Sequence, residues 1–186
     1  MPFVSRAAQK LAHGLATFHL DVHGFVCADF GCSTGGFTDC LLQNGAAKVY
    51  AIDTGYGVLD WKLRNDARVV VMERMNAMHV ELPEKMDFIS IDTSWTKLEK
   101  LAENALHNLK PMGHIVALLK PHYEANPSLL RKGTLPLEHV ESIVAGVIEY
   151  LRTLGLETVG QTLSPITGNK GANKEMLLHL LPERKK

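Results

Sequence analysis

The stretch from Phe25 to Gly36, FVCADFGCSTGG, constrains the fold of this chain more than any other. An apolar run typical of a β-strand ends at Asp29, a glycine-rich turn follows, and the pattern from Phe37 to Gln43 is helical. A strand, a glycine turn and a helix form the first half of a βαβ unit, where nucleotide-like cofactors bind. The alternative is a turn that only joins a core strand to its helix.

The residues of this turn indicate which cofactor it would bind. A dinucleotide fingerprint places a second glycine against the pyrophosphate, but Ser33 occupies that position. Asp29, two residues before Gly31, would repel a pyrophosphate and would suit a cationic ligand. S-adenosylmethionine (SAM) carries a sulfonium, an ammonium and a ribose but no phosphate. The turn therefore favours SAM over NAD, with Asp29, Gly31, Ser33, Gly35 and Gly36 as candidate cofactor residues.

Composition limits the remaining choices. The 186 residues are 46% hydrophobic and 22% charged, which predicts one globular domain with a substantial core. Lys+Arg and Asp+Glu both number 20, so a nucleic-acid contact would need a local basic patch. The three cysteines lack a CxxC spacing, and the histidines lack an HExxH pairing. These patterns predict buried thiols in a reducing cytosol and no metal site.

The opening residues, MPFVSRAAQK, lack the apolar core of a signal peptide, and no apolar run is long enough to cross a bilayer. We therefore expect a soluble, cytoplasmic protein with no membrane partner.

Strand and helix patterns alternate along the chain, which predicts an α/β doubly wound sheet. After the first strand, further strands are expected at residues 49–53, 69–72, 86–91, 114–119, 157–163 and 176–180. A first helix, capped by Ser5, is expected to extend to about Phe18. Further helices are expected around residues 98–106 and along an apolar stripe from Val140 to Leu151 that Gly155 would cap. Residues 110–113 are expected to form a turn, and residues 124–135 a mobile loop.

Polar residues follow several of these strands. They are Asp29, Asp53, Asn76, Asp92 and Lys120. The carboxyl ends of parallel strands share one edge of a sheet, where ligands bind. Asp53 lies 24 positions after Asp29, near the spacing at which an acid binds a ribose diol. The alternative role for Asp53 is a helix or turn cap.

Basic and aromatic residues mark candidate RNA contacts. Residues 55–64 form a glycine-broken loop with Trp61, Lys62 and Arg64, a combination suited to base stacking and phosphate contact. An equally good alternative is a Trp folded over the edge of the core with solvated charges beside it. Arg6 on the first helix and Lys132 in the loop before the long helix are further candidates.

Five segments resemble a known family: VSRAAQKL, DFGCSTGGFTDCLLQ, AIDTGYGVLDWKLRND, ALLKP and SPITGNKG. They are similar to the hemolysin A (TlyA-type) branch of the FtsJ-like ribosomal RNA methyltransferases, from Val4 to Leu180. The resemblance implies a Rossmann-like class I SAM-dependent methyltransferase fold. Its mostly parallel seven-stranded sheet would have an antiparallel last strand and helices on both faces. It also implies methyl transfer to a ribose 2′-hydroxyl of ribosomal RNA.

The resemblance assigns roles to residues. The family's catalytic Lys-Asp-Lys-Glu set would be Lys10, Asp92, Lys120 and Glu175. Its cofactor positions would be Gly35, Phe37, Asp53, Asn76 and Asp92. The chain departs from the family pattern in three places. We expect a single domain at 1–186 without the family's usual N-terminal S4-like RNA-binding domain. The residues SRAAQK replace a more glycine-rich start, and Thr93-Ser94-Trp95 stands where Val-Ser-Phe is usual.

The chemistry of methyl transfer suits these four residues. A ribose hydroxyl is a weak nucleophile, so it must be aligned with the methyl group and lose a proton. A lysine accepts that proton only if its amine is partly neutral, which burial and a neighbouring cation favour. We expect Lys120 to be the base or the hydroxyl-orienting group and Asp92 to be its partner. Lys10 and Glu175 would be positioning groups, although from the residues alone they could form a surface charge pair.

Three other functions remain as alternatives: an NAD-dependent oxidoreductase, a non-catalytic or regulatory SAM-binding protein of the hemolysin A type, and a membrane-lytic protein. Ser33 and Asp29 count against the first, and the lack of a spanning segment counts against the third. The expected partners are ribosomal RNA or ribosomal subunits, with a homo-oligomer or an RNA-targeting partner left open.

Overall fold

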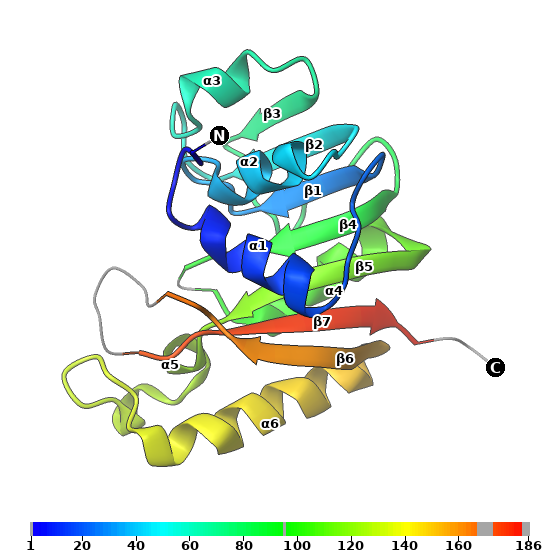
Figure 1. The fold of residues 1–186 in the computed structure, drawn as a ribbon. Coiled ribbons are helices and arrows are strands. Elements are labelled where there is room, and N and C mark those ends of the chain that lie inside the picture. Colours follow the sequence, from blue (N-terminus) through cyan, green and yellow to red (C-terminus); the bar gives the residue numbers. More distant parts are fainter. Residues whose placement is uncertain (1, 95, 167–172, 184–186) are drawn as a thin grey trace.

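The computed structural model describes residues 2–94, 96–166 and 173–183. Figure 1 shows a twisted seven-stranded sheet in the order β3-β2-β1-β4-β5-β7-β6. The strands are β1 (Val26–Phe30), β2 (Lys48–Asp53), β3 (Val69–Glu73), β4 (Met86–Ile91), β5 (Leu109–Leu119), β6 (Leu156–Leu163) and β7 (Met176–Pro182).

Strands β1 to β5 run parallel, whereas β7 is antiparallel to both neighbours, β5 and β6. The strand order reverses at β1, which lies between β2 and β4. At such a switch point the carboxyl ends of the strands open a crevice for ligands. The expected α/β sheet and its antiparallel last strand are confirmed.

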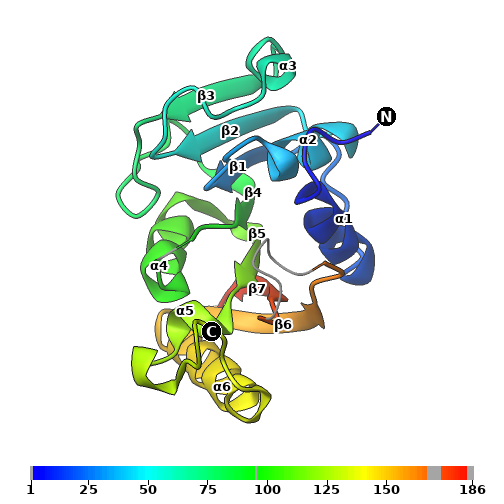
Figure 2. The ribbon, with the colours of Figure 1, turned by 90° about the vertical axis from the view of Figure 1, so that its left-hand side faces the viewer.

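Helices cover both faces of the sheet (Figure 2). They are α1 (Ala8–Thr17), α2 (Gly36–Gln43), α3 (Trp61–Arg64), α4 (Leu98–Asn108), α5 (Pro121–Glu124), α6 (Leu137–Thr153) and a 3-10 turn, η1 (Pro127–Leu129). One apolar cluster joins α1 and α2 to one face, and a second joins α4 and α6 to the other. The result is a three-layer α/β/α domain.

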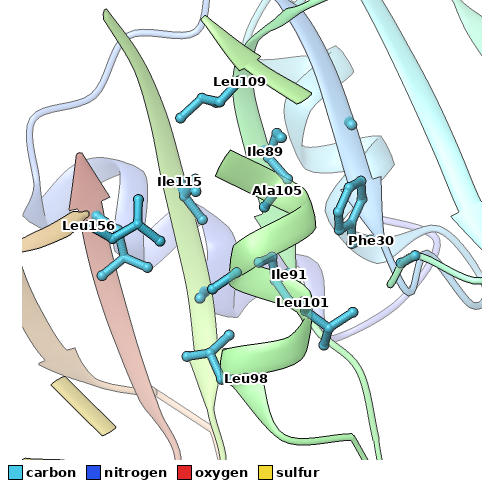
Figure 3. Close-up of a cluster of buried hydrophobic side chains, with 14 of the residues drawn as sticks. Phe30, Ile89, Ile91, Leu98, Leu101, Ala105, Leu109, Ile115 and Leu156 are labelled. Atoms are coloured by element: carbon cyan, nitrogen blue, oxygen red, sulfur yellow. The ribbon is translucent and has the colours of Figure 1, made fainter. Parts of the chain in front are cut away.

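The expected apolar stripes form this core. Figure 3 shows Leu98, Leu101 and Ala105 of α4 in one apolar cluster with Ile89 and Ile91 of β4, and all five side chains are buried. Parallel strands that are covered on both faces are apolar along most of their length, as β4 is.

The three cysteines are buried and form no disulfide, as predicted. Burial raises the pKa of each thiol. None of the helices in the described ranges is both long and apolar enough to cross a membrane.

Two loop expectations are wrong. Residues 110–113, expected to form a turn, belong to β5, which starts at Leu109 and pairs with β4 through a register shift between Met86 and Phe88. The stretch 124–135, expected as a mobile loop, contains η1 and a bridge between Arg131 and Thr134. The first helix begins at Ala8 with Ala7 at its N-cap position, so Ser5 is not the N-cap that we expected. The cap at Gly155 (φ +84°) is confirmed.

Candidate active site

The glycine turn after β1 is held tightly against the neighbouring strands. Backbone N–H groups of Gly31 and Cys32 both donate to the carbonyl of Ile52 in β2, at 2.9 and 3.0 Å. Gly31 has φ +88°, and a Cβ there would lie 2.6 Å from the Asp92 carbonyl oxygen. Gly35 has φ +99°, and a Cβ there would collide with Leu63. The sequence needs glycine at both positions because space and backbone conformation exclude other residues.

Asp53, at the end of β2, fastens the turn from the other side. Its Oδ2 accepts a hydrogen bond from the Ser33 N–H at 2.9 Å, and its Oδ1 accepts one from the Gly55 N–H at 2.7 Å. A carboxylate has about four acceptor positions. Asp53 therefore keeps capacity for two ligand hydroxyls.

Asp29 differs from its expected role. Its side chain is fully buried and accepts hydrogen bonds from the hydroxyls of Thr38 (2.8 Å) and Ser90 (2.9 Å). Burial raises the pKa of this carboxyl to about 7, although the two hydroxyl hydrogen bonds oppose the shift. We expected Asp29 to contact the cofactor directly. The structure instead buries this carboxyl beneath the turn, where it can only support the residues that line the site.

The four catalytic candidates form two ion pairs. Lys120 Nζ lies 2.5 Å from Asp92 Oδ1 and donates to the Thr93 carbonyl at 2.9 Å. Lys10 Nζ lies 2.5 Å from Glu175 Oε2. Lys10 and Glu175 are 7% and 6% exposed, so the alternative of a surface charge pair is wrong.

Both ion pairs face one cavity of about 770 Å³, which also borders the glycine turn. This volume lies in the usual range for small-molecule sites. The candidate residues that line it are Arg6, Lys10, Gly31, Ser33, Gly36, Phe37, Asp92, Lys120, Lys132 and Glu175. Residues from opposite ends of the chain therefore meet at the carboxyl edge of the sheet.

Seven candidates do not line this cavity, and of these only Gly35 belongs to the glycine turn itself. They are Asp29, Gly35, Asp53, Trp61, Lys62, Arg64 and Asn76. The Oδ1 of Asn76 accepts the Met78 N–H at 3.0 Å, which closes a local turn.

Trp61 is 77% exposed on α3, so the alternative in which it covers the core edge is wrong. The guanidinium of Arg64 instead binds Glu73 and the Leu59 carbonyl. The structure thus gives Arg64 a folding contact where we expected a cation available to RNA. Lys62 Nζ lies 3.6 Å from Asp39 Oδ1.

Two polar residues that support the site, Asp39 and Asn173, were not predicted from the sequence. Asp39 is 1% exposed and accepts the Val4 N–H, and an acid in the first turn of a helix is a weak signal for such a role. Asn173 hydrogen-bonds residues 133 and 135, which nothing in the sequence pattern indicates.

The family model described as FtsJ-like methyltransferase matches residues 3–180. The chain belongs to this family. Two curated proteins are similar to this FtsJ-like methyltransferase over 96% of its length. Hemolysin A of Brachyspira hyodysenteriae is 39% identical and has 77% of its own length covered. The 16S/23S rRNA (cytidine-2′-O)-methyltransferase TlyA of Mycobacterium tuberculosis is 40% identical and has 68% covered.

A solved structure agrees with this placement. A protein of Streptococcus thermophilus that carries the hemolysin name superposes on this FtsJ-like methyltransferase with a TM-score of 0.95. The two are 37% identical, and the match covers 100% of this chain and 69% of the other. The resemblance to the hemolysin A branch is confirmed.

Proposed function

We propose that this FtsJ-like methyltransferase transfers a methyl group from SAM to a ribose 2′-hydroxyl of ribosomal RNA. One observation carries the proposal: the Lys120–Asp92 and Lys10–Glu175 pairs line the cavity that the glycine turn borders. The similarity to a protein named as an rRNA (cytidine-2′-O)-methyltransferase supports the substrate class. Ribosomal RNA as substrate implies action in the cytoplasm.

The residues at the turn fit SAM. When bound, SAM supplies a methyl group that its cationic sulfur has already activated. Gly31, Ser33, Gly36 and Phe37 would form the wall around it, and Asp92 supplies a carboxylate beside that wall. Asp53, next to the turn, would bind the ribose diol through its remaining acceptor positions.

In this proposal Lys120 holds the ribose hydroxyl. An ammonium has three donors, and Asp92 and the Thr93 carbonyl bind two of them. The third donor can orient the hydroxyl oxygen. Because Asp92 lies 2.5 Å from Nζ, it can also take a proton from Lys120, and the resulting amine can accept the hydroxyl proton.

Lys10 and Glu175 complete the polar wall. Two buried charges that neutralise one another form a fixed dipole, which needs little reorganisation during the reaction. Because this pair joins α1 to the start of β7, it also fixes the two segments that frame the cavity.

We infer that RNA reaches the cavity across basic and aromatic residues on its rim. Arg6 and Lys132 line the cavity, and Trp61 with Lys62 presents an exposed ring and a cation on α3. The substrate would be free ribosomal RNA or a ribosomal subunit, and a partner or a second copy of the chain would add affinity.

Transfer of labelled methyl from SAM to ribosomal RNA and to isolated subunits tests the proposal. Wild type should label RNA, whereas Lys120→Ala should lose about a hundredfold or more in rate and still bind SAM in a calorimetric titration. Lys100→Ala, on the exposed face of α4, is the matched control. Undiminished transfer by Lys120→Ala would remove Lys120 from the mechanism. SAM binding without transfer by wild type would favour a regulatory SAM-binding protein.

A further inference from the structure

A two-residue β-hairpin borders the active-site cavity between η1 and α6. Arg131 and Thr134 exchange backbone hydrogen bonds of 2.8 and 3.0 Å. The two residues between them, Lys132 and Gly133, have φ of +52° and +80°, as in a type I′ turn. Left-handed backbone at a lysine is uncommon, so the turn holds Lys132 in a conformation that this residue type rarely adopts.

Asn173 ties this hairpin to the catalytic segment. Its Oδ1 accepts the Leu135 N–H at 2.9 Å, and its Nδ2 donates to the Gly133 carbonyl at 3.0 Å. Asn173 lies two residues before Glu175, and both line the cavity together with Lys132. Leu135 is only 3% exposed, so the base of the hairpin is anchored in the core. One side chain therefore couples the hairpin to Glu175.

Lys132 differs in charge environment from the other lysines of the cavity. Lys10 and Lys120 are each neutralised by a carboxylate at 2.5 Å. Among the residues that the structure describes, no carboxylate lies within ion-pair distance of Lys132, and its side chain is exposed. The hairpin thus presents an uncompensated cation to the cavity.

The chemistry of the substrate requires an anion near this cation. In RNA the 2′-hydroxyl and the 3′-phosphate are attached to adjacent ribose carbons. A cavity that admits the hydroxyl must therefore also admit, or lie against, that phosphate. Lysine binds phosphate as a point charge. This requirement distinguishes an RNA methyltransferase from one that acts on a small neutral molecule.

We propose that Lys132 binds the phosphate next to the methylated ribose and that Asn173 is the positioning residue that holds the Lys132 hairpin in place. The inference rests on the proposed function and adds the substrate contact to it. It gives the hairpin one task, which is to set the distance between the sugar–phosphate backbone and Lys120.

Lys132→Asn separates charge from folding. An Asn-Gly pair is the preferred sequence for a type I′ turn, so this variant keeps the hairpin and removes only the cation. We expect SAM binding and the unfolding midpoint to stay at wild-type values, and KM for ribosomal RNA to rise about fivefold. The salt slope of RNA binding should fall by about 0.7, which corresponds to one phosphate on a single strand. Lys100→Gln is the matched surface control.

Asn173→Ala tests the coupling. Loss of both hydrogen bonds should accelerate exchange of the Leu135 amide proton and raise KM for RNA by about the same factor as Lys132→Asn. When Asn173→Ala is combined with Lys132→Asn, it should raise KM for RNA by less than a further twofold, because the effects of two residues that act through one contact are not additive. A merely structural role for Asn173 would give full additivity.

The outcomes are distinct. If wild type methylates RNA and Lys132→Asn matches wild type in both KM and salt slope, Lys132 binds no phosphate and the inference fails while the proposed function stands. If the two substitutions add fully, Asn173 does not position Lys132. If wild type transfers no methyl group to RNA, the proposed function fails, and the inference fails with it.

Discussion

The Asp39 carboxylate accepts a hydrogen bond from the backbone N–H of Val4, with 2.9 Å between Oδ2 and N. This contact joins the first residues of the chain to α2, which begins at the glycine turn. The approach is close, because a Cβ on Gly36 would lie 3.0 Å from both Ala7 Cβ and the Ala8 nitrogen. Lys10 follows on α1, so Asp39 helps to set its position over the cavity.

Asp39→Ala should therefore affect both stability and catalysis. The Val4 N–H is partly buried, so loss of its acceptor should cost about 1 kcal/mol in unfolding free energy, and methyl transfer should fall about tenfold as α1 loosens. Chemical denaturation and the transfer assay measure the two effects. Asp21→Ala removes an exposed carboxylate that accepts one backbone N–H, and it should change neither quantity. Equal behaviour of the two variants would contradict the role of Asp39.

The Lys10–Glu175 pair predicts a separation of stability from activity. Glu175→Gln leaves the buried Lys10 charge without its counter-ion, which should cost about 3–5 kcal/mol. Replacing both residues by apolar ones, as in Lys10→Met with Glu175→Leu, should recover much of that loss because no charge remains buried. Methyl transfer should be lost in Glu175→Gln, and it should remain lost in the double variant although stability recovers. Denaturation curves and transfer rates on the same samples check this, and recovered transfer would show that the pair is only structural.

Two glycines with positive φ should respond differently to alanine. A Cβ on Gly57 would meet open space, so Gly57→Ala costs only the free energy of a left-handed backbone conformation at alanine, about 1 kcal/mol. Gly35, at the start of α2, has the same unfavourable backbone conformation, and its alanine side chain would also collide with Leu63 of α3. We expect Gly35→Ala to lose at least twice as much unfolding free energy and to weaken SAM binding. Similar losses in both variants would mean that the turn tolerates a side chain.

Asp29 predicts an unusual pH dependence. Its folded-state pKa of about 7 lies above the usual 3.8, so the folded state binds more protons than the unfolded state between these values. The carboxyl therefore destabilises the fold progressively as pH rises from about 4 to about 7. Asp29→Asn removes this dependence, and its unfolding free energy relative to wild type should improve by about 2 kcal/mol between pH 5 and pH 8. A constant difference across that range would contradict the raised pKa.

The sequence predicted the elements whose signals are local. The apolar runs that became β1, β4 and β7, the stripe on α4 and the glycine turn all depend on neighbouring residues, and the structure has each where it was expected. The polar residues at strand ends were also found, because parallel strands share an edge. The resemblance, not the periodicity, supplied Lys10 and Glu175, which are 165 positions apart and meet only in three dimensions.

What the sequence could not predict depends on depth and on distant contacts. Asp29 lies one residue before the end of β1, and Asp53 is the last residue of β2. Thr38 and Ser90 enclose the Asp29 carboxyl, whereas Asp53 remains partly exposed. The start of β5 at Leu109 depends on a register shift against β4, so residues 110–113 read locally as a turn. The hydrogen bonds from Asn173 to the hairpin join residues that are 38 and 40 positions apart in the sequence, and no local pattern predicts such contacts.

The antiparallel direction of β7 determines at which edge of the sheet Glu175 lies. Glu175 directly precedes this strand, and because β7 runs against β5, its first residue pairs with the last residue of β5, Leu119, beside Lys120. A parallel β7 of seven residues would carry Glu175 to the opposite rim, about 20 Å away. The antiparallel β7, sixth in the sheet order, thus places the Glu175 carboxylate at the same edge of the sheet as Lys120.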